Sequence, residues 1–199
     1  NKTEQKWWGE GVLSWGEFLS KQKIKGLSGA RKDAFDWHVK TAGDKIRQDD
    51  ENYFAKAFRQ GDHWRLFDQF GDQAVFLDIE TDGFYGGVTV VGLYDGDQSK
   101  TMVRGFNLDK YLFQKELEKY KLLITFNGTC FDVPVLERYF GCKIIQPHID
   151  LRFVCQKVGL VGGLKSIEME LQIKRRKEVA NFTGEDAVYL WHMWKSTGD

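Results

Sequence analysis

Hydrophobic and polar positions follow two different periods along the chain, and the change comes near residue 70. Residues 1–70 carry apolar side chains at helical spacing and few β-branched residues, which predicts helices. From Gln73 onward, short apolar or alternating runs predict strands. We therefore expect a helical extension, residues 1–70, packed on a core domain, residues 71–199. We expect the tryptophans of the extension to pack its helices onto the rest of the protein: Trp7, Trp8, Trp15, Trp37 and Trp64.

Capping and turn residues place the predicted elements more closely. Ser14 followed by Glu17 matches a capping box at a helix start, and Asp95-Gly96 is a hairpin turn signal. Strands are predicted at 74–80, 87–94, 100–106, 121–126 and 143–149, and helices at 29–48, 50–59, 109–120, 131–140, 151–158, 164–171 and 185–195. A three-strand antiparallel meander, followed by strands that alternate with helices, predicts an α/β fold with a mixed sheet flanked by helices.

Composition narrows the class of protein. The chain of 199 residues is 42% hydrophobic and 29% charged, as in a folded domain. Lys and Arg together equal Asp and Glu at 29 each, so the net charge gives no sign of a basic nucleic-acid surface, although an enzyme that binds only a few nucleotides stays possible. No apolar run approaches the roughly 20 residues of a membrane span. Three cysteines without metal-ligand spacing suit the cytoplasm, and no oligomeric state is predicted.

Two carboxylates stand near the end of an apolar strand. Asp78 and Glu80 are two residues apart, so in a strand they share one face. Removing both from water costs several kcal/mol unless a cation neutralises them. Oxygen ligands favour Mg²⁺ or Mn²⁺. The alternative is a pair of solvated carboxylates at a strand end.

A third carboxylate, Asp132, follows the next buried strand. That strand breaks at Asn127-Gly128, and Asp132 falls in the first turn of the helix that follows. Ligands bind at such strand ends in open α/β sheets. Asp132 alone is as well explained as a helix cap or as a complement to the helix dipole. Combined with Asp78 and Glu80, it favours a functional site.

These motifs carry a resemblance to a known family. Asp78-Ile79-Glu80-Thr81 and Asn127-Gly128-x-x-Phe131-Asp132 resemble the first two motifs of the DEDD 3′–5′ exonucleases of the ribonuclease H-like superfamily. The order of further segments is similar to the YprB-like bacterial branch: His63–Phe67, His148–Leu151, Gly162–Glu168 and Gly184–Trp191. The resemblance covers about residues 60–199. It implies a ribonuclease H-like fold and hydrolysis of nucleic acid from its 3′ end, with two Mg²⁺ or Mn²⁺ ions held by four carboxylates.

Carried over by position, the resemblance implies that Asp78, Glu80 and Asp132 are catalytic and bind the metal. Asp186 is the candidate within this chain for the fourth catalytic carboxylate. However, Phe182 stands where the family has Tyr or His, and Thr183 with Asp186 matches a capping box. The resemblance implies instead that the fourth carboxylate lies beyond Asp199, and we expect the chain to be cut short at its carboxyl end.

Two further groups of residues are weaker candidates. His148 and Asp150 are two apart on a predicted strand, and we expect them to support the site rather than contact the substrate. The basic run Lys174–Lys177 could hold phosphates, but a solvated face is slightly favoured.

Three functions are consistent with these residues. The first is a metal-dependent 3′–5′ exonuclease acting on DNA or RNA, with a single-stranded substrate because a frayed end enters without an unpairing cost. The second is a non-catalytic nucleic-acid-binding module with an incomplete ribonuclease H-like site. The third is an aspartate-nucleophile phosphatase, faintly suggested by Asp78–Gly83. A phosphatase would need Asp at position 80 and an all-parallel sheet, so Glu80 and the hairpin at Asp95-Gly96 speak against it.

Overall fold

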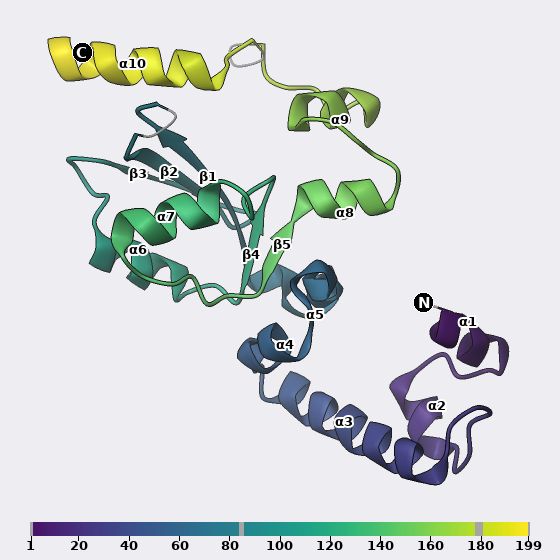
Figure 1. Ribbon diagram of the computed structural model, residues 1–199. Helices are drawn as coiled ribbons and strands as arrows, with labels where there is room; N and C mark the ends of the chain where they lie inside the picture. Colours follow the sequence, from purple (N-terminus) through teal and green to yellow (C-terminus); the bar gives the residue numbers. More distant parts are fainter. Residues whose placement is uncertain (1, 84–85, 178–180, 199) are drawn as a thin grey trace. The chain divides into compact units, whose positions relative to one another are not determined.

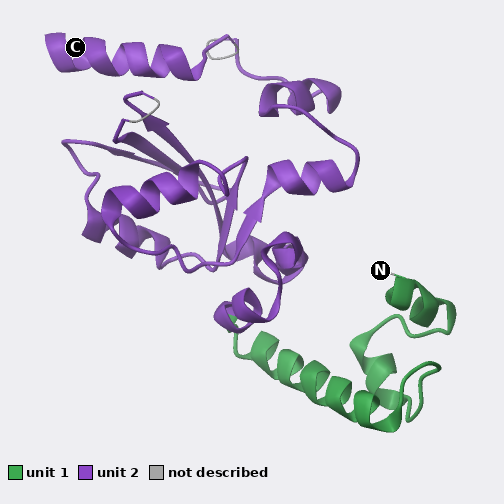
Figure 2. Ribbon diagram, in the orientation of Figure 1, with its two compact units in different colours: residues 1–50 green, residues 51–199 purple. Residues whose placement is uncertain are grey.

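The protein consists of two compact units, residues 1–50 (unit 1) and residues 51–199 (unit 2), coloured separately in Figure 2. The computed structural model describes residues 2–83, 86–177 and 181–198. Asp199, beyond which we expected the fourth carboxylate, lies outside the described residues. Residues 51–70, which the sequence pattern placed in the extension, belong to unit 2.

Unit 1 contains three helices, α1 (Lys2–Gly9), α2 (Trp15–Ser20) and α3 (Gly29–Arg47). The predicted capping box begins α2, where Ser14 Oγ accepts a hydrogen bond from Glu17 N at 3.2 Å. Trp7 packs against the core of this unit, with its ring 5.5 Å from that of Phe18. The other tryptophans lie outside the core of this unit, since Trp8, Trp15 and Trp37 are 53%, 45% and 62% exposed. A unit of this size has too small a core to bury them all.

Unit 2 is built on a five-stranded mixed sheet (Figure 1), which confirms the predicted fold class. The strands are β1 (Ala74–Thr81), β2 (Val88–Tyr94), β3 (Ser99–Val103), β4 (Leu122–Thr125) and β5 (His148–Asp150), in the order β3-β2-β1-β4-β5. β1, β2 and β3 are antiparallel, whereas β4 and β5 run parallel to β1. The antiparallel pairing of β1 with β2 contradicts the all-parallel sheet that the phosphatase alternative requires.

One predicted strand is shorter than its sequence pattern indicated. The run 143–149 forms a strand only from His148, and residues 143–147 are irregular. Pro147 has no N–H for the sheet, although its carbonyl accepts from Leu123 N at 2.9 Å. Ile144 N donates instead to Glu137 at 3.1 Å.

Two helices, α6 (Lys110–Leu117) and α7 (Asp132–Phe140), lie against one face of the sheet (Figure 1). The alternate residues Val75, Leu77 and Ile79 of β1 point into the core beneath them. The rings of Phe113 and Phe140 stack in this core at 4.6 Å. Burying each large apolar side chain contributes about 1.5–3 kcal/mol. The intervening residues of β1, including Asp78 and Glu80, therefore face the opposite side of the sheet.

The remaining helices of unit 2 either precede β1 or follow β5 in the chain. They are α4 (Glu51–Ala57), η1 (Gln60–Leu66), α5 (Phe67–Phe70), η2 (Gly71–Gln73), α8 (Leu151–Lys157), α9 (Leu164–Glu170) and α10 (Gly184–Thr197). Trp194 of α10 packs on Phe106 at 5.4 Å, and Trp191 lies under the guanidinium of Arg104 at 4.8 Å. Among the helices described, none combines the length and the apolar character needed to cross a membrane.

Candidate functional site

Asp78 lines an open cleft on the sheet face opposite to α6 and α7. Its cross-strand partner on β2 is Gly92, which has no side chain to fill the space beside the carboxylate. The cleft has a volume of about 480 Å³. Phe76 and Tyr94 line it as neighbours across the strands, with ring centroids 6.2 Å apart. The Asp78 carboxylate is therefore accessible from a cleft with aromatic walls.

Asp132 reaches β1 from the first turn of α7. β4 pairs with β1 only as far as Phe76, which leaves the following residues of β1 without a strand partner on that edge. Asp132 Oδ1 fills this position by accepting from Ile79 N at 3.1 Å. Asp132 is buried, with 3% of its surface exposed. The structure thus brings Asp132 to the residue that stands between Asp78 and Glu80.

The three carboxyls interact electrostatically. Burial, followed by the negative charge of Asp78, raises the pKa of Asp132 to about 6. Burial also raises the pKa of Glu80, again with repulsion from Asp78 as the second cause. Asp78 faces the cleft, but the surrounding protein still shields its carboxyl from water. This burial raises the pKa of Asp78 as well. A cation between these groups would relieve both the desolvation and the repulsion.

The turn from β4 into α7 is held in a single geometry. Thr125 Oγ1 accepts from Gly128 N at 3.0 Å, and a Cβ added at Gly128 would lie only 2.2 Å from that oxygen. Asn127 has a φ of 65°, a left-handed conformation that Asn tolerates better than most residues. The Asn127-Gly128 pair, seen in the sequence as a strand breaker, is therefore required by the close approach of the turn to Thr125.

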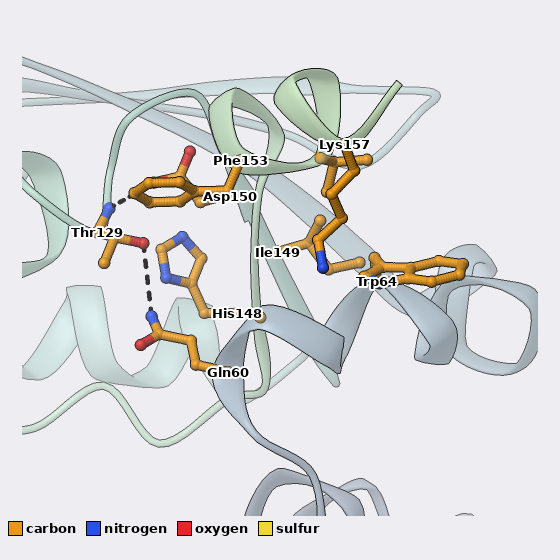
Figure 3. A pocket seen from close by; sticks show the side chains of 10 residues that line it. Gln60, Trp64, Thr129, His148, Ile149, Asp150, Phe153 and Lys157 are labelled. Carbon is orange, nitrogen blue, oxygen red and sulfur yellow. Dashed lines mark hydrogen bonds between the residues drawn. The ribbon is translucent and has the colours of Figure 1, made fainter. Parts of the chain in front are cut away.

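Asp150 and His148 of β5 support this turn. Asp150 accepts from Asn127 N at 2.7 Å and from Thr129 N at 3.0 Å, and His148 Nε2 lies 2.8 Å from Thr125 Oγ1. Figure 3 shows Asp150, His148 and Thr129 at one side of a pocket of about 260 Å³ that has Trp64 and Phe153 among its walls. In this pocket the carboxylate of Asp150 accepts hydrogen bonds from backbone N–H groups. Both residues thus have the supporting role that the sequence analysis favoured.

Arg175 stood out in the sequence only as one member of the basic run Lys174–Lys177. It lies in the loop after α9, close enough to Asp78 for its positive charge to lower the pKa of that carboxyl. Its Nε donates to Glu168 at 2.6 Å, which holds the guanidinium in place. The solvated-face interpretation of Lys174–Lys177 therefore fails for Arg175. No local pattern distinguishes this arginine, because only the path of the chain after α9 brings it to β1.

Asp186 is engaged as a helix cap. Its carboxylate accepts from Thr183 N at 2.7 Å, and the two residues form the predicted capping box of α10. Hydrogen bonds from Thr183 lower the pKa of Asp186, with a smaller contribution from Lys165. The pKa of Asp186 shows no influence of the carboxyls on β1 and α7.

The fit of a metal can be judged from the donors. Asp78, Glu80 and Asp132 supply only carboxylate oxygens, which are the ligands of Mg²⁺ and Mn²⁺. Across residues 2–83, 86–177 and 181–198, no three His, Cys, Asp or Glu side chains converge closely enough to hold an ion as they stand. The donor chemistry and the mutual repulsion fit a divalent cation, and binding would require these side chains to converge.

Comparisons with solved structures give only distant similarities. One is a family B DNA polymerase from the hyperthermophilic archaeon Pyrobaculum calidifontis, with 14% identity over 60% of this chain and 21% of that chain, at a TM-score of 0.49. Another is Escherichia coli RNase D, an exoribonuclease, with 20% identity over 57% of this chain and 32% of that chain, at a TM-score of 0.45. The chain thus spans about a fifth and a third of these two proteins. Similarities this distant carry no argument about activity.

Sequence comparison is more informative. No curated protein sequence matches the chain. A family profile described as RNase_H superfamily matches residues 75–199, a segment that contains the five-stranded sheet apart from Ala74, together with Asp78, Glu80 and Asp132. That segment is more than half of the chain, and the protein therefore belongs to the RNase_H superfamily.

Proposed function

We propose that this protein is a metal-dependent 3′–5′ exonuclease of the DEDD type, in the YprB-like branch, that hydrolyses single-stranded DNA or RNA. The observation that carries the proposal is that Asp132 reaches the backbone of β1 between Asp78 and Glu80, where Asp78 lines an open cleft. We also place the protein in the cytoplasm, because all three of its cysteines are free, as in a reducing compartment.

In this proposal, Asp78, Glu80 and Asp132 hold two Mg²⁺ or Mn²⁺ ions. When bound, the ions would activate the attacking water and stabilise the charge that develops on the phosphate. The hydrogen bond from Ile79 N anchors the carboxylate of Asp132 to β1, between Asp78 and Glu80. Arg175, already close to Asp78, supplies a positive charge for the scissile phosphate.

The cleft beside Asp78 suits an unpaired strand. Phe76 and Tyr94 offer aromatic surface, on which unpaired bases stack with little dependence on sequence. Lys100 also lines the cleft, with its ammonium paired to Glu116. Paired bases could not reach these rings without losing their partners. These features support the single-stranded form of the substrate.

The test is a hydrolysis assay with 5′-labelled single-stranded DNA and RNA, in Mg²⁺, in Mn²⁺ and in EDTA. We expect a ladder that shortens from the 3′ end and needs a divalent ion. Asp78→Asn should abolish it, since the amide removes a charged ligand at unchanged size. Asp97→Asn, on the exposed turn between β2 and β3, is the matched control and should cut like the wild type. Metal-independent cutting, or equal cutting by Asp78→Asn, would refute the proposal.

The alternative is a nucleic-acid-binding module without catalysis. It is favoured by one observation, the use of Asp186 as a helix cap rather than as a fourth ligand. In the same assay this alternative predicts that the wild type retains labelled strands and shortens none of them. Hydrolysis that is lost in Asp78→Asn would exclude it.

A further inference from the structure

We propose that a cleft in unit 1 binds the phosphodiester backbone of single-stranded nucleic acid, as a site separate from the carboxylates. The unit 1 cleft has a volume of about 350 Å³ and lies between α1 and the start of α3. Its lining residues are Lys2, Thr3, Lys6, Trp7, Lys25, Gly26, Leu27, Arg31 and Phe35. The role of the bound strand as a substrate rests on the proposed function, but the binding itself does not.

Four exposed cations surround the unit 1 cleft. They are Lys2, Lys6, Lys25 and Arg31. Within the described part of the chain, none of the four forms an ion pair. Three other cations of unit 1 are neutralised by carboxylates, in the pairs Lys32–Asp36, Lys45–Asp50 and Arg47–Asp44. Lys21, Lys23 and Lys40 also have no ion pair among the described residues, but they lie outside the cleft, whereas the four cleft cations are gathered where an anion can reach them together.

The position of Lys6 shows how closely the cleft draws its charges together. Gly26 has a φ of 86° in the loop before α3, and Lys6 Nζ lies 3.2 Å from the point that a Cβ at Gly26 would occupy. The ammonium of α1 therefore sits directly over the loop that carries Lys25. Successive phosphates of a strand repel one another, and cations brought together from two segments offset that repulsion.

The distribution of charge along the sequence agrees with this location. Residues 1–32 contain seven Lys and Arg against three Glu, whereas residues 33–199 contain 22 Lys and Arg against 26 Asp and Glu. One of the three, Glu17, is used in the capping box of α2. The formal net charge of zero for the whole chain hides this separation. Unit 2 contains 19 Lys and Arg against 21 Asp and Glu, so its net charge offers no attraction for a polyanion.

Two aromatic rings favour a single strand over a duplex or a free phosphate. Trp7 and Phe35 line the unit 1 cleft and are half-buried, with ring centroids 6.3 Å apart. Their inner faces belong to the small core around Phe18, which fixes them as rigid walls. Cations that track the backbone, combined with aromatic rings for the bases, are the usual elements of single-strand binding.

The test measures binding of labelled oligo-dT and oligo-U to the full chain in EDTA, where hydrolysis cannot interfere. We compare Lys6→Gln/Lys25→Gln with the control pair Lys23→Gln/Lys40→Gln, which removes two exposed lysines of unit 1 outside the cleft. The cleft pair should weaken binding about tenfold and reduce the slope of log affinity against log salt by about 1.4, the value for two lost phosphate contacts. The control pair should stay within about twofold of the wild type.

Three results would overturn the inference. They are equal losses in the two pairs, unchanged binding in the cleft pair, and equal affinity for a duplex of the same length. Lys6→Arg/Lys25→Arg keeps the charge and should restore binding, which separates a charge effect from damage to the fold. Hydrolysis of a trinucleotide tests the proposed function separately, because so short a strand depends little on the unit 1 cleft. If the wild type hydrolyses the trinucleotide and the cleft pair binds strands as tightly as the wild type, only this inference is refuted. If the cleft pair loses strand binding but the wild type hydrolyses nothing, only the proposed function is refuted.

Discussion

The carboxylate site of unit 2 and the cationic cleft of unit 1 are built in opposite ways. Asp132 is buried and fixed by a backbone hydrogen bond, and the turn that carries it leaves no room for a Cβ at Gly128. The cleft cations are exposed ends of flexible side chains without ion pairs among the described residues. Catalysis requires ligands held within fractions of an ångström, whereas attraction to a polyanion requires only charge of the right sign. Substitutions should therefore separate the two regions.

The largest effect should come from Glu80→Gln. Loss of one charged ligand is expected to lower hydrolysis by about 10³-fold, because charge stabilisation at the phosphate is reduced. Strand binding in EDTA should not fall, since the substitution removes a negative charge from an already acidic unit. Single-turnover hydrolysis and fluorescence anisotropy measure the two quantities. A parallel loss of both would mean that the two regions do not act separately.

Arg175→Gln should have the next largest effect. If Arg175 holds the scissile phosphate, hydrolysis should fall by about 10- to 100-fold, and Arg175→Lys should recover part of it. Arg176→Gln is the matched control, because it removes a neighbouring charge that has no influence on the pKa of Asp78. An equal loss in both variants would indicate general attraction of the strand rather than a specific contact.

Gly128→Ala should destabilise unit 2 by about 1–3 kcal/mol, because the new Cβ would overlap Thr125 Oγ1. Urea unfolding measures this change. Gly163→Ala is a suitable control, since a Cβ there meets no atom within 4 Å. In the double variant with Thr125→Ala, the loss should be smaller than the sum of the single losses, because the overlaps with Thr125 Oγ1 and Cγ2 are removed and only that with Thr125 Cβ, at 2.6 Å, remains. Additive losses would show that the close approach at Gly128 is unimportant.

The smallest effect concerns the stability of the metal-free protein. The pKa of Asp132 is about 6 in the folded protein against an ordinary value of 3.8 for an Asp side chain, so between these values the folded state holds a proton that the unfolded state has lost. The free energy of unfolding therefore falls as pH rises from about 4 to 6, and the cost persists above that window. Asp132→Asn cannot ionise and still offers an acceptor to Ile79 N.

We therefore expect Asp132→Asn to stabilise the protein above pH 6, by an amount on the order of 1 kcal/mol, and to have no such effect near pH 4. Thermal unfolding in EDTA at pH 4, 6 and 8 checks this, with Asp97→Asn as the control. Equal stabilisation at every pH would point to packing rather than to the ionisation of Asp132.

The strands and the carboxylates could be predicted because their signals are local. A period of two in Ala74–Glu80 sets both the strand and the shared face of Asp78 and Glu80. The sequence predictions failed where contacts with other parts of the chain, or the lack of them, decided the structure. Pro147 cannot donate to the sheet and shortens the last strand, and the tryptophans of unit 1 find no core large enough to bury them. The predicted boundary near residue 70 followed the change of period, whereas the compact units divide at residue 50.

The sequence alone determined the order of the motifs, the mixed sheet and three carboxylates of the candidate site, because spacing within a strand or a helix turn fixes side-chain direction. Tertiary structure alone decided which distant groups meet. It set Asp132 against Ile79, Asp150 against the Asn127-Gly128 turn, Arg175 near Asp78, and the lysines of α1 over the loop before α3. Such contacts depend on the path of the chain through space, and no local periodicity encodes that path.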